Sequence, residues 1–336
     1  MAERSTLNQI VQLGVETTPG TVATVTKKLA AASIEPSPQV EVDQFRPAGQ
    51  KFKTFTALGK EWATASLSGR LTYNEIVYLL SSVVSSATIT TPGGATNARN
   101  WSFASSPYVD DTPKTFTVEH GSSVRADRFT YGLVNEIGLN FSRQSCEISG
   151  SMMGKAIEDN FAGGLTTSGV TQLSLLPVLP TQVSIYMAAT RAGLGGASKL
   201  TRVLGAEWSL GNRYNPVWPI DASLAATYAA IIESEPDLSM SLTMEADAAG
   251  MGPLANLRAG DTRYIRIEGV GAEIDAGVNN NKFTLDTCVQ VTGTGGFSDQ
   301  DGVYAIQWNF AGITDGSWSG GARAFQIDVV NALTAL

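Results

Sequence analysis

Short segments of strictly alternating apolar and polar residues run along much of this chain. In residues 63–70, for example, Ala63, Ala65 and Leu67 are separated by Thr and Ser residues. This period of two predicts a β-strand with one buried face. Thr, Ser and Val, together with 34 glycines, favour strands and turns over helices. We therefore expect a mainly β protein.

One segment has helical spacing instead. Its apolar residues lie at i, i+3, i+4 and i+7, at Ile76, Leu79, Leu80 and Val83. Thr72 precedes Glu75 by three residues, which is the spacing of a capping box. A second helix is expected near residues 251–255, with Asp247 as its N-cap and Gly260 as its C-cap.

An internal repeat predicts that the chain contains the same domain twice. Residues Ala156–Gly163 recur as Ala305–Gly312, with six of eight positions identical. Further matches in the same order pair Leu67 with Leu242, Val118–Glu119 with Ile267–Glu268, and Phe141 and Cys146 with Phe283 and Cys288. We predict tandem β-sandwich or barrel domains at residues 1–179 and 180–336, each with one packed helix and long loops. The alternative is chance similarity between β-rich segments.

Composition narrows the classes of protein. A length of 336 residues suits two domains, and a net charge of −8 with a sequence pI near 4.8 argues against tight binding to DNA or anionic membranes. No signal peptide and no apolar stretch of membrane-spanning length is visible. Cys146 and Cys288 are expected to be reduced, buried thiols in a protein made in cytoplasm.

Signatures of catalysis are absent or weak. The single histidine, His120, excludes His-based zinc clusters and would have to carry any Ser-His-Asp triad alone. Residues 299–302 faintly resemble a calcium loop, but the bidentate Glu at its twelfth position is missing, so a turn is favoured. We expect no enzyme activity, no catalytic residue, no cofactor and no metal.

Aromatic and basic residues are mixed in one irregular stretch of the first half, which we interpret as a long hairpin or loop. Its members are Phe45, Arg46, Phe52, Lys53 and Phe55, and the matching region of the second half holds Tyr214 and Trp218. Such a mixture is typical of single-stranded nucleic-acid sites or of protein interfaces. Because the chain is acidic overall, we favour contacts with a neighbouring subunit. The polar loop Ser85–Pro113 occurs in the first half alone.

Three segments resemble a known family. The run Leu13–Thr21 (LGVETTPGT), the junction Leu71–Glu75 leading into residues 76–80, and the ending Val329–Leu333 are similar to tail tube proteins of phages with long, non-contractile tails. The resemblance implies packed sheets plus a helix, and sheets that join between subunits into the wall of a tube. Most members are single-domain and form six-fold rings. A doubled chain implies three chains per ring.

The resemblance also implies partners and a location. The chain would bind copies of itself and other tail proteins, such as the tape measure, tail tip and terminator. It would be assembled in the bacterial cytoplasm and lie in the virion tail, where double-stranded DNA passes through without specific binding. A non-basic wall would let DNA slide. Four strand carboxylates are candidates for that wall: Glu136, Glu147, Glu273 and Asp275.

Two alternative functions remain open at this point. One is another virion or secretion-tube component of the same fold, such as a terminator or an injected tube protein. The other is a β-sandwich adhesin or carbohydrate-binding module, whose aromatic residues would line a groove on one domain.

Overall fold

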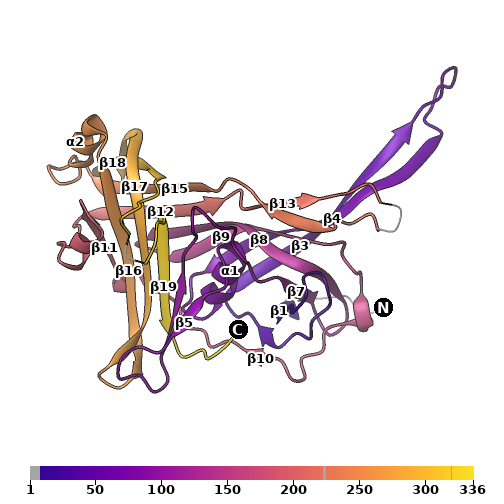
Figure 1. Cartoon of the computed structure of the whole chain (residues 1–336), viewed down its shortest axis with the longest axis horizontal. Coiled ribbons are helices and arrows are strands. Elements are labelled where there is room, and N and C mark those ends of the chain that lie inside the picture. Colours follow the sequence, from indigo (N-terminus) through magenta and orange to yellow (C-terminus); the bar gives the residue numbers. More distant parts are fainter. Residues whose placement is uncertain (1–7, 222–224, 319) are drawn as a thin grey trace.

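The computed structural model describes residues 8–221, 225–318 and 320–336, and this part of the chain is mainly β (Figure 1). The fold class predicted from the alternating pattern is therefore confirmed. Two α-helices accompany the described strands. Single turns of 3-10 helix occur at Phe161–Gly163, Pro180–Gln182 and Ala192–Gly195.

Six long strands and one helix make up the first half of the chain. They are β1 (Ile10–Val15), β3 (Ala32–Phe45), β4 (Phe55–Arg70), α1 (Glu75–Val83), β7 (Phe116–Gly121), β8 (Ala126–Ser142) and β9 (Cys146–Gly154). Neighbouring strands pair antiparallel in the order β1–β7–β8–β9–β4–β3.

The second half repeats this arrangement. Its elements are β11 (Val183–Ala188), β12 (Val203–Gly211), β15 (Asp237–Glu245), α2 (Pro253–Ala259), β16 (Thr262–Asp275), β17 (Asn279–Gln300) and β18 (Val303–Gly312). The antiparallel order is β11–β16–β17–β18–β15–β12. Along the chain, the helix follows β4 in the first half and β15 in the second, which is the third of the six strands in each case. Pairing order and helix position therefore both recur.

The sequence motif that suggested the repeat does not lie at matching places. Ala305–Gly312 is part of strand β18, whereas Ala156–Gly163 follows the end of β9 and includes a 3-10 turn. Cys146 pairs across a hairpin with Phe141, but Phe283 and Cys288 share one strand. These two alignments are wrong. Identical side chains can serve a strand or a turn because the neighbouring strands decide which forms.

A continuous ladder of backbone pairs joins the two halves. Strand β12 pairs antiparallel with β8, from Gly205 opposite Ser142 to Leu210 opposite Ile137. This joint produces one large sheet in the order β3–β4–β9–β8–β12–β15–β18–β17. Strands β8 and β17 are long enough to bend away from this sheet. Beyond the bend, β8 also pairs with β7, and β17 also pairs with β16.

The remaining strands have two to seven residues each. They are β2 (Lys27–Lys28), β5 (Thr88–Thr90), β6 (Arg99–Phe103), β10 (Thr171–Gln172), β13 (Tyr214–Val217), β14 (Ala230–Glu233) and β19 (Phe325–Asn331). Strands β13 and β14 pair with each other as a separate two-stranded sheet. Strand β19 pairs with both β17 and β6. The loop Ser85–Pro113 is therefore partly a strand, which adds to the sheet of the other half.

One hydrophobic core extends through both halves. It contains Trp208 and Trp308 from the second half as well as Ile137 and Leu139 from the first. The rings of Phe141 and Phe283 meet across the halves with centroids 6.1 Å apart. The halves thus bury apolar surface against each other, while the division at residues 179 and 180 stays a prediction.

Helix α1 is confirmed at the predicted place, and all nine of its residues are buried. The backbone N–H of Glu75 donates to Thr72 Oγ1 at 3.1 Å, which is half of the expected capping box. The Glu75 carboxylate instead accepts N–H groups of residues 30–32 at 2.5–3.1 Å. Helix α2 ends at Gly260 with φ of 68°, as expected.

Asp247 does not cap α2 directly. Its Oδ1 accepts the N–H groups of Ala249 and Gly250, in the turn before the helix begins at Pro253. Proline at the first helical position needs no N–H partner, so the helix begins without a side-chain cap.

Because the Glu75 carboxylate is buried and holds three backbone N–H groups, its loss should destabilise the first half strongly. We expect Glu75→Ala to lower the free energy of unfolding by about 3 kcal/mol. Urea denaturation followed by circular dichroism measures this change. Glu147→Ala removes an exposed carboxylate paired with Arg70 and should change the free energy by less than about 1 kcal/mol. Equal effects of the two variants would contradict this role of Glu75.

Candidate assembly surfaces

The large sheet has one face covered by short polar side chains, which we call the polar face. The strand registers place its middle residues in one line across six strands: Ser33, Ser68, Ser149, Gly138, Ser209 and Ser239. The apolar residues between them along each strand, such as Leu139 and Met240, are buried in the core. The alternation seen in the sequence therefore gives this sheet one apolar and one polar face.

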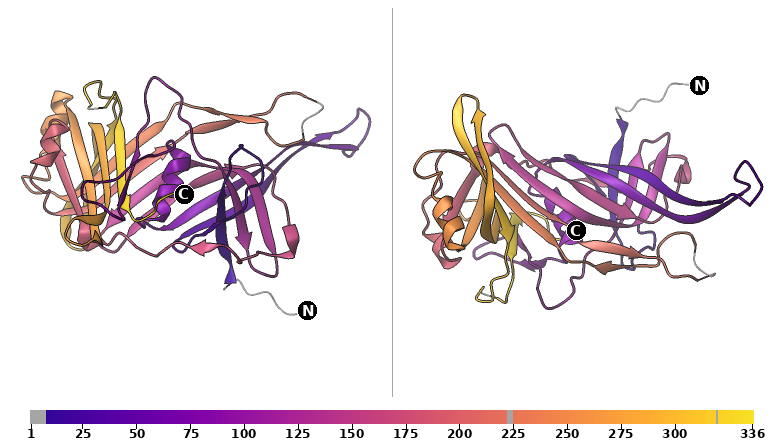
Figure 2. Two further views of the ribbon diagram at one scale, coloured as in Figure 1. Left: turned by 60° about the horizontal axis from the view of Figure 1, so that its bottom comes forward. Right: turned by 90° about the horizontal axis from the view of Figure 1, so that it is seen from above.

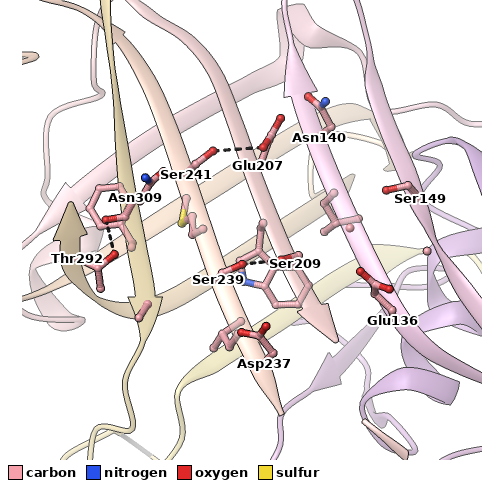
Figure 3. Close-up of a pocket in the computed structure, with 18 of the residues that line it drawn as sticks. Glu136, Asn140, Ser149, Glu207, Ser209, Asp237, Ser239, Ser241, Thr292 and Asn309 are labelled. Carbon is pink, nitrogen blue, oxygen red and sulfur yellow. Dashed lines mark hydrogen bonds between the residues drawn. The ribbon is translucent and has the colours of Figure 1, made fainter. Parts of the chain in front are cut away.

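A broad hollow of about 820 Å³ lies over the polar face where the two halves join (Figure 3). The Oγ atoms of Ser209 and Ser239 are 2.7 Å apart, and the Ser241 hydroxyl donates to Glu207 at 3.4 Å. A Cβ on Gly138 would meet the Ser149 Oγ at 2.8 Å, so a larger residue there would have to displace the Ser149 hydroxyl. Small residues keep the hollow open.

Carboxylates give the hollow a negative charge. Glu136, Glu207 and Asp237 line it and come from three successive strands, β8, β12 and β15 (Figure 3). Of the predicted wall residues, Glu136 therefore lies in the hollow. Glu147 is exposed on neighbouring β9, where it pairs with Arg70 at 3.2 Å.

The other two predicted wall residues lie elsewhere. Glu273 and Asp275 are at the end of β16, which pairs with β11 and β17 away from the polar face. The Asp275 carboxylate accepts the backbone N–H groups of Asn97 and Ala98 at 3.0 and 3.1 Å. It anchors the loop before β6, so its assignment to the same wall is wrong. Strand alternation alone could not show which sheet β16 joins.

Both ends of the large sheet are open edges. Among the described residues, β3 pairs with β4 alone, and residues 291–300 of β17 pair with β18 alone. An unpaired edge presents N–H and C=O groups that can recruit another strand. Inside the chain, the β8–β12 joint shows how such edges combine.

Two prolines lie on the open edge of β3. Glu61, opposite Val40, donates its N–H away from β3 to Ala226 O at 3.0 Å. Val40 and Glu61 are therefore a pair without mutual hydrogen bonds, and the backbone groups of Val40 point away from β4. Because this direction alternates along a strand, Pro36, Pro38 and Val40 all turn their backbone toward the open edge. Pro36 and Pro38 therefore remove two donors from that edge, which is a common protection of edge strands.

The outer ends of β3 and β4, with the turn between them, form a long exposed hairpin that we call the arm (residues 38–61). It extends away from the body in all three views (Figures 1 and 2). Its large apolar side chains are 43–72% exposed: Val40, Val42, Phe45, Phe52, Phe55 and Leu58. The predicted hairpin is confirmed, and five predicted contact residues, Phe45, Arg46, Phe52, Lys53 and Phe55, lie on its outer part.

The two predicted contact residues of the second half pack inside the chain. Tyr214 is 2% exposed, so the expectation that it forms a subunit contact is wrong. Trp218 packs edge-on against Trp62 at the base of the arm, with ring centroids 5.8 Å apart, and the Lys60 ammonium lies 5.0 Å from the Trp218 ring centroid. This part of the second half therefore supports the arm of the first.

A fully buried arginine, Arg213, holds three segments together. Its Nε donates to Val83 O at 2.8 Å at the end of α1, and its guanidinium binds the Asp111 carboxylate. Its Nη1 lies 2.9 Å from Glu233 Oε1. Burial raises the pKa of the Asp111 carboxyl, and the Ser105 hydroxyl and Arg213 oppose that shift. Arg213 thereby fixes the loop ending at Asp111 against β14.

Next to Arg213 is a second hollow of about 610 Å³, which we call the groove. Its walls are formed by residues 105–110 and by residues 233–236 with Leu238. Three carboxylates, Asp110, Glu233 and Glu235, and one cation, Arg213, line it, so the groove is acidic on balance. Tyr108 and Val109 expose 79% and 71% of their surfaces at its wall.

Cys146 and Cys288 are confirmed as free and buried. Burial raises the pKa of the Cys146 thiol to about 11, so it stays protonated at neutral pH. His120 lies in β7 opposite Val11, and burial lowers its pKa while Asp127 and Glu35 oppose the shift. In the described ranges, no group of three or more His, Cys, Asp or Glu side chains could hold a metal ion.

Sequence reasoning missed the serine line, Arg213 and the two edge prolines. The serines had a visible signal, because Ser66 and Ser68, and Ser239 and Ser241, alternate with buried residues. Arg213 had none, since Asp111 is 102 residues away. Pro36 and Pro38 are visible in the sequence, but only strand pairing shows that they face an open edge.

Removing Arg213 should release the segments that it joins. We expect Arg213→Met to destabilise the chain by about 3–5 kcal/mol, because Asp111 and Glu233 lose their buried partner. It should also speed proteolysis within residues 105–111. Chemical denaturation and limited proteolysis with mass spectrometry measure both effects. In the matched control Arg202→Met, which removes an exposed partner of Glu245, the cost should stay within about 1 kcal/mol.

Comparison with known proteins gives no assignment. No protein-family model matches this chain, and a search of curated proteins finds no significant match. Within the described residues, no helix is both long enough and apolar enough to cross a membrane.

Proposed function

We propose that this chain is a structural protein that assembles with copies of itself into stacked rings, forming a tube through which DNA passes. The observation that carries the proposal is the large sheet, which has a polar face of short side chains and an open edge at each end. The short sequence resemblances to tail tube proteins of long-tailed phages support the same function. No chemical step is required of any residue.

The joint inside the chain is a template for joints between chains. Strand β8 of the first half pairs with β12 of the second. In the repeated pairing order β17 corresponds to β8, and β3 corresponds to β12. The edge of β17 in one chain would then receive β3 of the next. Contacts of this head-to-tail kind close into rings when the rotation permits. Three such chains would give a ring of six similar units.

The edge prolines make the two kinds of joint unequal. The repeat pairs Leu67 with Leu242, and these residues lie opposite Ile34 and Ala206 respectively, so Ile34 corresponds to Ala206. Two residues further along, Pro36 of β3 corresponds to Trp208 of β12. A joint at β3 therefore has fewer backbone donors than the β8–β12 joint. Each missing hydrogen bond weakens it by about 0.5–1.5 kcal/mol. Side-chain packing between chains must supply the remaining stability.

The polar face suits the inner wall of a DNA conduit. Duplex DNA carries about one negative charge per 1.7 Å, and clustered Lys or Arg would bind it strongly. The hollow is lined by hydroxyls, amides and carboxylates, including Asn140 and Asp237, which offer the phosphates no such attraction (Figure 3). A carbohydrate-binding groove would instead be expected to expose aromatic rings. In this proposal the tube belongs to a virion tail, assembled in the host cytoplasm with its tape measure, tip and terminator proteins.

Electron microscopy of the purified chain tests the proposal. We expect long tubes whose rings contain three chains and six similar units. Rings that never stack would favour a terminator, and monomers under all salt and temperature conditions would contradict the proposal.

Restoring the missing donors on β3 should strengthen the joint between chains. We expect Pro36→Thr combined with Pro38→Thr to lower the protein concentration at which rings form about tenfold, because two N–H groups become available. Light scattering and negative-stain images give this concentration. Pro92→Thr, in the loop between β5 and β6, is the control and should leave it unchanged. An unaltered threshold in the double variant would exclude the β3 edge from the ring joint.

A further inference from the structure

We infer that the tip of the arm binds in the groove of a second copy of this chain and so links one ring to the next. The inference rests on the proposed function and adds the receiving surface and the chemistry of the contact. The arm and the groove belong to different copies, and their exposed residues are complementary in charge and in apolar character.

The arm needs a partner that encloses it. Phe45 lies opposite Phe55, and Val42 lies opposite Leu58. These two pairs are separated by an odd number of positions, so they lie on opposite faces of the hairpin. A flat surface would cover one pair and leave the other in water. Burying a large apolar side chain contributes about 1.5–3 kcal/mol, so a hollow that takes both faces is strongly favoured.

The outer end of the arm is basic. Between Gln44 and Thr54 the charged residues are Arg46, Lys51 and Lys53, with no carboxylate among them. The Lys51 ammonium lies over the Phe52 ring, and Lys53 Nζ donates to Gln44 Oε1 at 2.6 Å. The partner surface should therefore be acidic and should accept aromatic side chains.

The groove supplies both properties. Asp110, Glu233 and Glu235 line it, and in the described part of the chain neither Asp110 nor Glu235 forms an ion pair. Tyr108 and Val109 present apolar surface at the same wall. Arg213 holds both walls in place before any partner arrives, which reduces the entropy lost on binding.

The occupant is another copy because the arm points away from its own body (Figures 1 and 2). From its base near Glu61 to the turn at Gly49 the arm extends on the order of 30 Å. The packing of Trp218 on Trp62 and the Glu41–Lys60 ion pair at 3.4 Å hold the base in position. The chain carries a net charge of −8, so the basic tip of one copy is attracted electrostatically to another copy.

Charge reversal on each side tests the contact. The arm variant combines Lys51→Glu with Lys53→Glu, and the groove variant combines Asp110→Lys with Glu235→Lys. All four positions are exposed, and circular dichroism checks that each variant folds. Each double variant should still form rings but reduce total tube length about tenfold or more in electron micrographs. The combined quadruple variant should recover tube length to within about twofold of the unmodified chain.

The control Glu158→Lys with Asp159→Lys makes the same charge change as the groove variant, at exposed positions far from both surfaces in the sequence, and should leave the tubes unchanged. Unchanged tubes in the arm or groove variant, or no recovery in the quadruple variant, would overturn the contact alone. If the unmodified chain forms neither rings nor tubes, the proposed function fails as well.

Disulfide trapping gives an independent measurement. We expect Phe52→Cys combined with Val109→Cys to link copies under mild oxidation and to produce a ladder of multiples on a non-reducing gel. Cys146 and Cys288 are buried and do not compete. The comparison variant Phe52→Cys with Tyr304→Cys places the second thiol on the exposed β17–β18 hairpin. An equal ladder from the comparison variant would contradict docking in the groove.

Discussion

The backbone ladder between β8 and β12 is the interaction on which the whole architecture depends. It joins two separate sets of strands into one large sheet, and the pairing of β19 with β6 adds a second backbone link between the halves. Because side chains alternate along paired strands, the same ladder decides that Trp208 enters the core while Ser209 faces the polar side. A slip of one residue would exchange these faces across the joint, so the buried tryptophan and the register stabilise each other.

The two halves also share one hydrophobic core. Phe141 of the first half and Phe283 of the second share one core, so unfolding of either half exposes apolar surface of both. The two halves should therefore behave as one cooperative unit. The arm and the groove walls carry exposed apolar side chains outside this core and are held in place by local contacts of Trp218 and Arg213.

Much of the fold could be predicted from local patterns. The alternation at residues 63–70, the helix at Ile76–Val83 and the Asp301–Gly302 turn all depend on near neighbours in sequence, and all are present. Positive φ angles of 54° and 83° at this turn suit Asp and Gly. Patterns do not show which strands become neighbours, so they do not reveal that Asp275 anchors the loop before β6 or that Tyr214 is buried. A period of two shows that one face is buried, but not what covers it.

The arm has a counterpart in the second half, whose described residues are 212–221 and 225–236, and the two differ in what they contact. Strands β13 and β14 of the counterpart run back along the base of the arm, where Trp218 packs on Trp62. Similar units that differ in this way cannot be exchanged for one another. In the proposed ring, projecting arms would belong to alternate units. Each ring would then have three-fold but not six-fold symmetry. Successive rings would be superposed by rotations of a third of a turn but not of a sixth, so the first halves of the chains would follow distinct helical paths along the tube.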